Sequence, residues 1–314
     1  MDQFIVLMFC FLLGVILKEK GKLKPDDAGA LNRVIVNCAL PALTFLSVTK
    51  LKFNSDLIYP LLSAWLVAGV SVIFFWYSCK PFKFDATTRV TLVLLAGFGS
   101  ASMMGPPMTS SLFGADYVAY AVLIGIGSTC VAFPVLGVLL ATQHSHGHIL
   151  NDGKSKPVHP WQIGRSVFSM VPFLALLAGV AAVLCGWPWS FSDHISNVLT
   201  PLASMMGFLT FLNIGIQIRV NDLSGRWKPI AVGTAFKLVL APLIIFGLYS
   251  VAGLSGSSLQ ITVFEMAMPS TVIAAVLAAD HQLDAKLARS MVTVTTLLSL
   301  VSLPLLSVAL KTYV

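Results

Sequence analysis

Residues 97–111 read GFGSASMMGPPMTSS and lie inside an apolar run that is long enough to cross a membrane. Each proline removes a backbone donor and clashes with a carbonyl one turn earlier, which costs about 3 kcal/mol in a helix interior. A continuous helix is therefore excluded, and the neighbouring glycines and hydroxyls suit an irregular backbone. Residues 264–271 read FEMAMPST and place Pro269 in the middle of another apolar run. The sequence thus predicts two broken membrane helices.

The whole chain is more apolar than a soluble protein. Of its 314 residues, 57% are apolar and 11% charged, whereas soluble domains have about 25% charged residues. This composition excludes an ordinary soluble enzyme and makes the lipid bilayer the expected surroundings. The net charge of +7 does not indicate a nucleic-acid partner, because the basic residues fall between the apolar runs. The five cysteines are spread singly, so neither a zinc site nor a disulfide framework is expected.

Apolar windows of about 20 residues, the length that crosses a hydrocarbon core of about 30 Å, recur ten times. These spans cover approximately residues 3–18, 30–49, 57–79, 90–113, 117–141, 165–186, 196–218, 229–253, 258–279 and 287–310. Sixteen of the twenty Lys and Arg residues fall in the loops that follow spans 1, 3, 5, 7 and 9, and only three fall on the other side. The positive-inside rule then predicts a multi-pass protein of the cell membrane, with both termini outside and the 142–164 loop in the cytoplasm.

The polar loop 142–164 divides the chain into two halves, 1–141 and 165–314, with five spans each. An odd number of spans inserts the second half in the opposite orientation, as in the inverted repeats of many secondary transporters. The two breaks occupy the fourth span of each half. We therefore expect an all-α integral membrane protein of ten transmembrane helices, arranged as two inverted five-helix repeats with broken, crossing helices 4 and 9.

The breaks are the candidate substrate site. Unwound backbone at this depth is tolerated only where it is buried in protein or lines a cavity, and the N-termini of half-helices attract anions. The alternative is a pair of ordinary proline kinks. The candidate substrate-binding residues are Met104, Gly105, Pro106, Pro107, Ser110, Met268, Pro269, Ser270, Thr271 and Asn37.

Two charged residues lie inside predicted spans, where each costs roughly 2.5 to 3.5 kcal/mol at the helix centre. Lys237 lies about 16 Å beyond Arg226 along the helix axis, and Glu265 precedes the second break. One interpretation is an ion pair that only neutralises itself. The functional hypothesis is that Glu265 binds a coupling sodium ion or carries a proton, with Lys237 as its counter-charge or as a switch. The hydroxyls of Ser128 and Thr129 are further candidate sodium ligands, although most such hydroxyls bond to their own helix.

No motif for covalent chemistry is present. The chain has no HExxH, GxSxG, phosphate-loop or dinucleotide fingerprint in a suitable setting, so an enzyme is not expected. The run His144-x-His146-x-His148 matches no standard zinc spacing and is expected to be part of a solvated linker. No cofactor or resident metal is expected, apart from a coupling sodium ion or proton.

Several short motifs occur in a specific order along almost the whole chain. They are LPALTF at 40–45, GPP with LFG at 105–114, Ile214-Gly215, AMPS at 267–270 with AAD at 278–280, and TTLLS at 295–299 with Leu303-Pro304. In this order they resemble the auxin efflux carrier family, which includes plant PIN carriers and bacterial organic-acid permeases.

The resemblance implies a fold of ten helices similar to that of bile-acid sodium symporters. It implies a scaffold made of spans 1, 2, 6 and 7, a transport domain made of spans 3–5 and 8–10, a homodimer, and elevator-type alternating access. Glu265 is similar to the sodium-ligating Glu of those symporters. Span 4 departs from them, because Pro106 and Pro107 stand where the symporters have polar ligands, so proton coupling and uniport stay open.

The expected function is therefore secondary active transport of a small organic anion, a mono- or dicarboxylate such as malonate or malate. An aromatic carboxylate such as indole-3-acetate is the alternative substrate. A membrane receptor of the same fold, which binds its ligand without moving it, is the alternative class of protein. A channel is less consistent with two matched breaks, which suit an occluded site.

Overall fold

The computed structural model describes residues 2–51, 57–128, 170–185, 189–218, 226–280 and 283–313, and these are almost entirely helical. The chain forms two compact units, each built from separate parts of the sequence. Unit 1 contains Met1–Leu57, Ala101–Ile126 and Phe168–Ile218, and unit 2 contains Ile58–Ser100, Gly127–Val167 and Arg219–Val314. Each unit is described by itself below.

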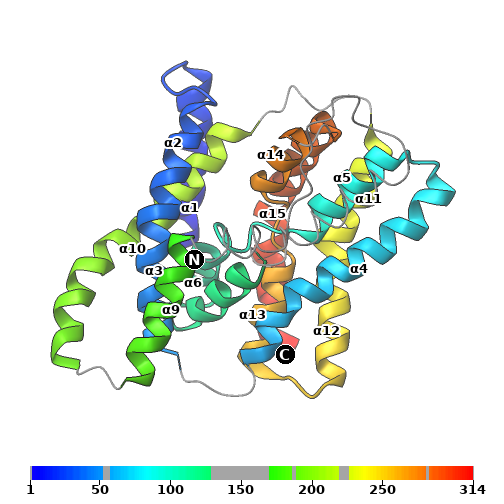
Figure 1. The fold of residues 1–314 in the computed structure, drawn as a ribbon. Coiled ribbons are helices and arrows are strands. Elements are labelled where there is room, and N and C mark those ends of the chain that lie inside the picture. Colours follow the sequence, from blue (N-terminus) through cyan, green and yellow to red (C-terminus); the bar gives the residue numbers. More distant parts are fainter. Residues whose placement is uncertain are drawn as a thin grey trace, which may run out of the picture. The chain divides into compact units, whose positions relative to one another are not determined.

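Unit 1 consists of α-helices with one wide π-helical turn and one short 3-10 turn (Figure 1). The elements are α1 (Asp2–Glu19), α2 (Asp27–Val34), η1 (Ile35–Ala39), α3 (Leu40–Thr49), α6 (Gly105–Leu112), η3 (Ala115–Tyr117), α9 (Val171–Leu184) and α10 (Trp189–Gln217). The helix Ala115–Ser128 also lies in unit 1 as far as Ile126. The long helix α10 packs against α1 and against the run from α2 to α3, while α9 packs on α3. The core of unit 1 includes Ile35 and Ala39, which are buried against Met206 and Leu209 of α10.

The crossing of α1 and α10 depends on two glycines. A Cβ on Gly14 would lie 2.3 Å from the carbonyl oxygen of Leu212, and a Cβ on Gly215 would lie 2.2 Å from the carbonyl oxygen of Phe11. Real side-chain carbons do not approach backbone this closely, so the two helices need glycine at both positions. Small residues at helix crossings are typical of membrane proteins, because they let the backbones come together.

Unit 2 contains a second set of helices (Figure 1). The elements are α4 (Ile58–Phe82), α5 (Ala86–Gly97), α11 (Trp227–Ala235), η5 (Phe236–Leu240), α12 (Ala241–Val251), α13 (Gly256–Met266), α14 (Val272–Asp280) and α15 (Ala285–Tyr313). Every residue of α5 from Val90 to Gly97 is buried, as expected for a helix that is apolar all round. It packs against α4, α11, α14 and α15 and forms the centre of this unit.

Two helical runs contain a wide π-helical turn, and in both runs a proline follows. The turn η1 precedes Pro41, and the turn η5 precedes Pro242. Because proline has no N–H to donate and crowds the preceding turn, the helix widens before it. Such turns are frequent at functional sites because they redirect side chains. The candidate residues Asn37 and Lys237 lie in these turns.

Within the described ranges, five helical runs are long and apolar enough to cross a membrane. They are Asp27–Thr49, Ile58–Cys79, His194–Gln217, Trp227–Val251 and Ala285–Thr312. Their exposed faces are apolar: in α15, for example, Leu298, Val301, Leu305 and Val308 follow helical spacing and are at least half exposed. Lipid, rather than water, is the solvent that such a face requires. The prediction of an all-α membrane protein is therefore confirmed, while the count of ten spans and the inverted repeat stay predictions.

Replacing Gly215 by Ala tests the crossing of α1 and α10. The new Cβ would force the helices apart, and we expect a loss of about 1 to 3 kcal/mol, the usual cost of overpacking. The matched control is Gly247→Ala, where a Cβ on an exposed face of α12 meets no atom within 4 Å. Thermal unfolding of the purified protein in detergent measures both. Equal unfolding temperatures for the two variants would contradict the claim that the crossing of α1 and α10 needs glycine at position 215.

Candidate functional site

Both predicted helix interruptions are present. Helix α5 ends at Gly97, and α6 starts at Gly105 with Pro106 and Pro107 in its first turn. The prolines therefore begin the second half-helix instead of lying in the break, because first-turn N–H groups have no intrahelical partner and nothing is lost by removing them. The second interruption separates α13 from α14 and contains Pro269.

Residues from the two interruptions pair with each other inside unit 2. Gly99 and Ser270 form an isolated antiparallel bridge. The backbone N–H of Ser100 donates to the carbonyl of Pro269 at 2.7 Å, and the N–H of Thr271 donates to the carbonyl of Phe98 at 3.4 Å. In hydrocarbon, backbone groups outside helices must find partners within the protein. The pairing satisfies these groups and joins the end of α5 to the start of α14.

A hydroxyl of α15 completes this arrangement. The N–H of Ser270 donates to Thr295 Oγ1 at 3.2 Å, and the same hydroxyl donates to the carbonyl of Met291 at 2.7 Å. Thr295 is fully buried and Ser270 is 2% exposed, so water does not replace this bond. Thr295 therefore positions the second break.

Lys237 reaches the bridge from the π-helical turn η5. A Cβ on Gly99 would lie 2.8 Å from Lys237 Nζ, 3.1 Å from its Cε and 3.2 Å from the carbonyl oxygen of Met268. The ammonium therefore lies against the unwound backbone, and only glycine at position 99 leaves room for it. The side chain of Lys237 is 2% exposed. Glu265, which is fully buried near the end of α13, is close enough for its charge to act on this ammonium.

The structure thus brings together part of the predicted site. Within unit 2 it gathers Lys237, Glu265, Met268, Pro269, Ser270 and Thr271 around the bridge. The candidates of unit 1 are Asn37, Met104, Gly105, Pro106, Pro107 and Ser110. Met104 to Pro107 are buried, whereas Asn37 is exposed and its amide donates to the carbonyl of Arg33 in its own helix.

Of the two candidate sodium ligands in the fifth span, the structure describes only Ser128. Ser128 is half-buried at the end of the helix Ala115–Ser128. Thr129 and the 142–164 linker lie outside the described residues. Across the part of the chain that is described, no group of three or more His, Cys, Asp or Glu is placed to hold a metal ion. The expectation of no resident metal stays a prediction.

Sequence reasoning missed Gly99 and Thr295 as site residues. Both stand in stretches that the sequence marks, Gly99 ahead of the tandem prolines and Thr295 in the TTLLS motif. Their roles depend on contacts with residues far away in the chain, Lys237 and Ser270. For Gly99, the signal available in the sequence was the presence of a glycine close to a predicted break.

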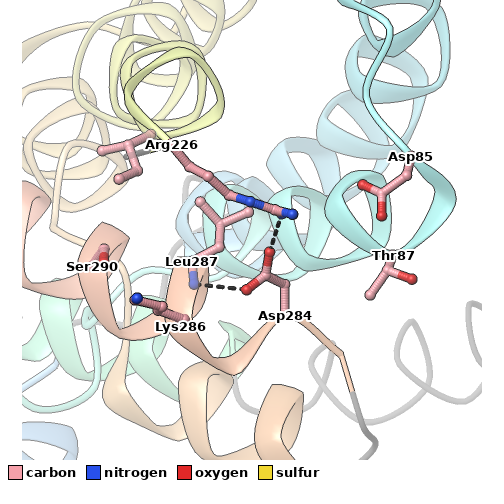
Figure 2. Close-up of a pocket in the computed structure, with 8 residues that line it drawn as sticks. Asp85, Thr87, Arg226, Asp284, Lys286, Leu287 and Ser290 are labelled. Atoms are coloured by element: carbon pink, nitrogen blue, oxygen red, sulfur yellow. Dashed lines mark hydrogen bonds and ion pairs between the residues drawn. The ribbon is translucent and has the colours of Figure 1, made fainter. Parts of the chain in front are cut away.

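A separate pocket of about 580 Å³ lies where three helices of unit 2 begin (Figure 2). Arg226, before α11, forms an ion pair with Asp284, before α15, and its guanidinium also donates to Thr88 Oγ1 at 3.2 Å. The other carboxylate oxygen of Asp284 accepts from the N–H of Leu287 at 2.9 Å, as an N-cap does. Asp284 therefore caps α15 and joins it to α11. The pocket contains none of the predicted substrate residues.

Replacing Thr295 by Val tests the role of its hydroxyl. Val keeps the shape but leaves the buried N–H of Ser270 without its acceptor, which costs about 1 to 3 kcal/mol. Thr262→Val is the matched control, because Thr262 is also fully buried and its hydroxyl only donates to its own helix, to Ser258. Thermal unfolding in detergent compares the two. A loss no larger than that of the control would show that Thr295 does not hold the break.

Two substitutions at Asp284 separate its two roles. Asp284→Ala removes both the cap and the ion pair and should lose roughly 0.5 to 2 kcal/mol from the cap. Asp284→Asn keeps a capping oxygen and removes only the charge. Because Arg226 is 56% exposed, removing the ion pair should lower the stability by less than about 1 kcal/mol. Thermal unfolding at low and high salt measures both. The effect of Asn should shrink in high salt, whereas the extra effect of Ala should persist. Equal losses for Ala and Asn would exclude the cap.

Comparison with known proteins gives one consistent result over almost the full length. The family described as "Membrane transport protein" matches residues 1–307. An uncharacterized transporter of Methanothermobacter thermautotrophicus is 31% identical over 95% of this chain and 94% of its own length. An uncharacterized transporter of Methanocaldococcus jannaschii is 23% identical over 97% of both chains. The uncharacterized transporter YfdV of Escherichia coli is 25% identical over 94% of this chain and 92% of its own. This chain therefore belongs to the membrane transport protein family, the auxin efflux carrier family that its motifs indicate.

Proposed function

We propose that this chain is a secondary transporter of small organic anions, mono- or dicarboxylates such as malonate or malate. The observation that supports this most is the bridge between the two breaks with the Lys237 ammonium against it. A buried positive charge beside unwound backbone is suited to a carboxylate. The membership of a transport family makes movement of that ligand the natural role.

The second break offers further groups for an anion. The hydroxyl of Ser270 is buried and has no hydrogen-bond partner among the described residues, so it is available to donate to a carboxylate oxygen. Helix α14 begins two residues later, and the N-terminus of a helix presents free N–H groups and a partial positive charge. Met268 and Pro269 supply the apolar surroundings that strengthen these interactions.

Glu265 is the proposed coupling group. It is fully buried at the end of α13, beside the break and within reach of the charge of Lys237. Ionisable residues inside a membrane usually belong to ion or proton pathways. A proton or a sodium ion on Glu265 would offset the negative charge that a carboxylate brings into the site.

The proposed mechanism is elevator-type alternating access between two inverted five-helix repeats. In it, spans 1, 2, 6 and 7 form the scaffold, and spans 3–5 and 8–10 form the transport domain. The scaffold spans fall in unit 1, and spans 3, 8, 9 and 10 fall in unit 2, which supports a movement between two parts. The second half of span 4 and span 5 as far as Ile126 also fall in unit 1, so the two units match the proposed domains outside these two spans. The proposal places both termini outside the cell membrane and the 142–164 loop in the cytoplasm, and it includes a homodimer. It involves no covalent chemistry.

Uptake by proteoliposomes tests this function. Labelled malonate is offered under a sodium gradient or a proton gradient, with unlabelled malate, other carboxylates and indole-3-acetate as competitors. We expect saturable uptake driven by a gradient, and loss of that gradient dependence in Glu265→Gln, since the amide carries no exchangeable charge. The matched control is Glu19→Gln, because Glu19 is 70% exposed.

The outcomes separate the alternatives. Competition by indole-3-acetate alone would select the aromatic carboxylates. Binding without uptake or counterflow, in folded protein, would overturn the transporter and favour a receptor. Flux that neither saturates nor follows an imposed gradient would favour a channel.

A further inference from the structure

The space between the two breaks is a place for one positive charge. Helices α5 and α13 both end there, at Gly97 and Met266, and the C-terminal end of a helix carries a partial negative charge. The carbonyl oxygen of Met268 lies 3.2 Å from the point where a Cβ on Gly99 would stand, and the buried Glu265 is close enough for its charge to act on the Lys237 ammonium. Unwound carbonyls and half-helix C-termini are the groups that coordinate a cation in transporters with broken helices.

That space is filled by the protein itself. Lys237 Nζ lies 2.8 Å, and the carbonyl oxygen of Met268 3.2 Å, from the point where a Cβ on Gly99 would stand. The side chain of Lys237 is almost wholly buried. A sodium ion at this point would have to lie in contact with the ammonium. The two positive charges would repel each other, and the ammonium occupies the space that the ion needs.

We propose that the Lys237 ammonium is a built-in substitute for an alkali cation between the broken helices, so that this protein binds no sodium there. The consequence for transport, carboxylate uptake without sodium, rests on the proposed function. The occupancy of the site by Lys237 does not rest on it.

The lysine extends from the π-helical turn η5. Lys237 is the second residue of this turn, which adds a residue to one turn of the helix. Phe236, its neighbour, is buried and its ring packs against those of Phe74 and Phe75 of α4. This packing fixes the backbone from which the lysine extends.

Sodium-dependent thermal stability tests the occupancy without any substrate. Purified protein is unfolded in detergent over a series of sodium chloride concentrations, with choline chloride keeping the ionic strength constant. A ligand that binds only the folded state raises the unfolding temperature with the logarithm of its concentration. We expect no difference between sodium and choline for the wild type, and a sodium-dependent rise for Lys237→Ala, in which the site is vacated. Lys237→Ser is the second vacating variant, for use if the Ala variant does not fold.

Lys237→Met is the matched control, because it fills the same space without a charge, and it should not respond to sodium. A sodium-dependent rise in the wild type would overturn the proposal. So would a folded Ala or Ser variant that does not distinguish sodium from choline, because the vacated breaks would then not form a cation site.

A double-mutant cycle tests the contact itself. Gly99→Ala should lower the unfolding temperature strongly in the wild type and much less in Lys237→Ala, since the ammonium that the methyl group meets is gone. Gly97→Ala is the control glycine: its Cβ would lie 2.7 Å from Ser71 Oγ, so its effect should be the same in both backgrounds. Equal effects of Gly99→Ala in the two backgrounds would remove the basis of the proposal.

Uptake in sodium-free proteoliposomes then distinguishes a failure of the proposed function from a failure of the inference about sodium. Absence of uptake for every organic anion would overturn the proposed function and leave the stability results standing. Uptake that requires sodium, in wild-type protein whose stability does not respond to sodium, would overturn the inference for transport while keeping the carrier.

Discussion

The site depends on one constraint: backbone groups that leave a helix inside hydrocarbon need partners within the protein. Among the described residues, two helical runs are interrupted, and residues from the two interruptions satisfy each other through the bridge between Gly99 and Ser270. The hydroxyl of Thr295, on α15, accepts the hydrogen bond from the N–H of Ser270. Since the pairing needs both breaks together, neither proline-containing segment can be understood as an isolated kink.

The same pairing explains why a buried lysine is tolerated. A charge in a membrane span is costly, but the bridge assembles helix ends, a carbonyl and Glu265 around one position, and each of them favours a cation. Gly99 is part of this solution because any side chain there would occupy the place of the ammonium. The cost of the charge and the cost of the unwound backbone are therefore offset by the same set of contacts.

The sequence predicts the parts of this structure that depend on local chemistry. Hydropathy predicts an all-α membrane protein, and the prolines predict both interruptions, because these effects act within one or two turns of helix. Lys237 and Glu265 are recognisable because charges are rare in apolar runs. Gly99 and Thr295 were missed, since their roles come from contacts between residues that are distant in the chain. The prolines could be placed within a few residues only: Pro106 and Pro107 start a helix instead of lying in the break.

The contacts of Lys237 show what a periodic sequence pattern does not determine. A regular helix would fix the face of each residue by its number, at 3.6 residues per turn. Lys237 lies at the start of the wide turn that precedes Pro242, so counting from Arg226 along the regular helix gives its depth and its face but not the residues of other helices that it meets. Depth alone is compatible with an ion pair that only neutralises itself. The contact with the unwound backbone is what gives the lysine a place in the candidate site, because it puts a positive charge where both broken helices end.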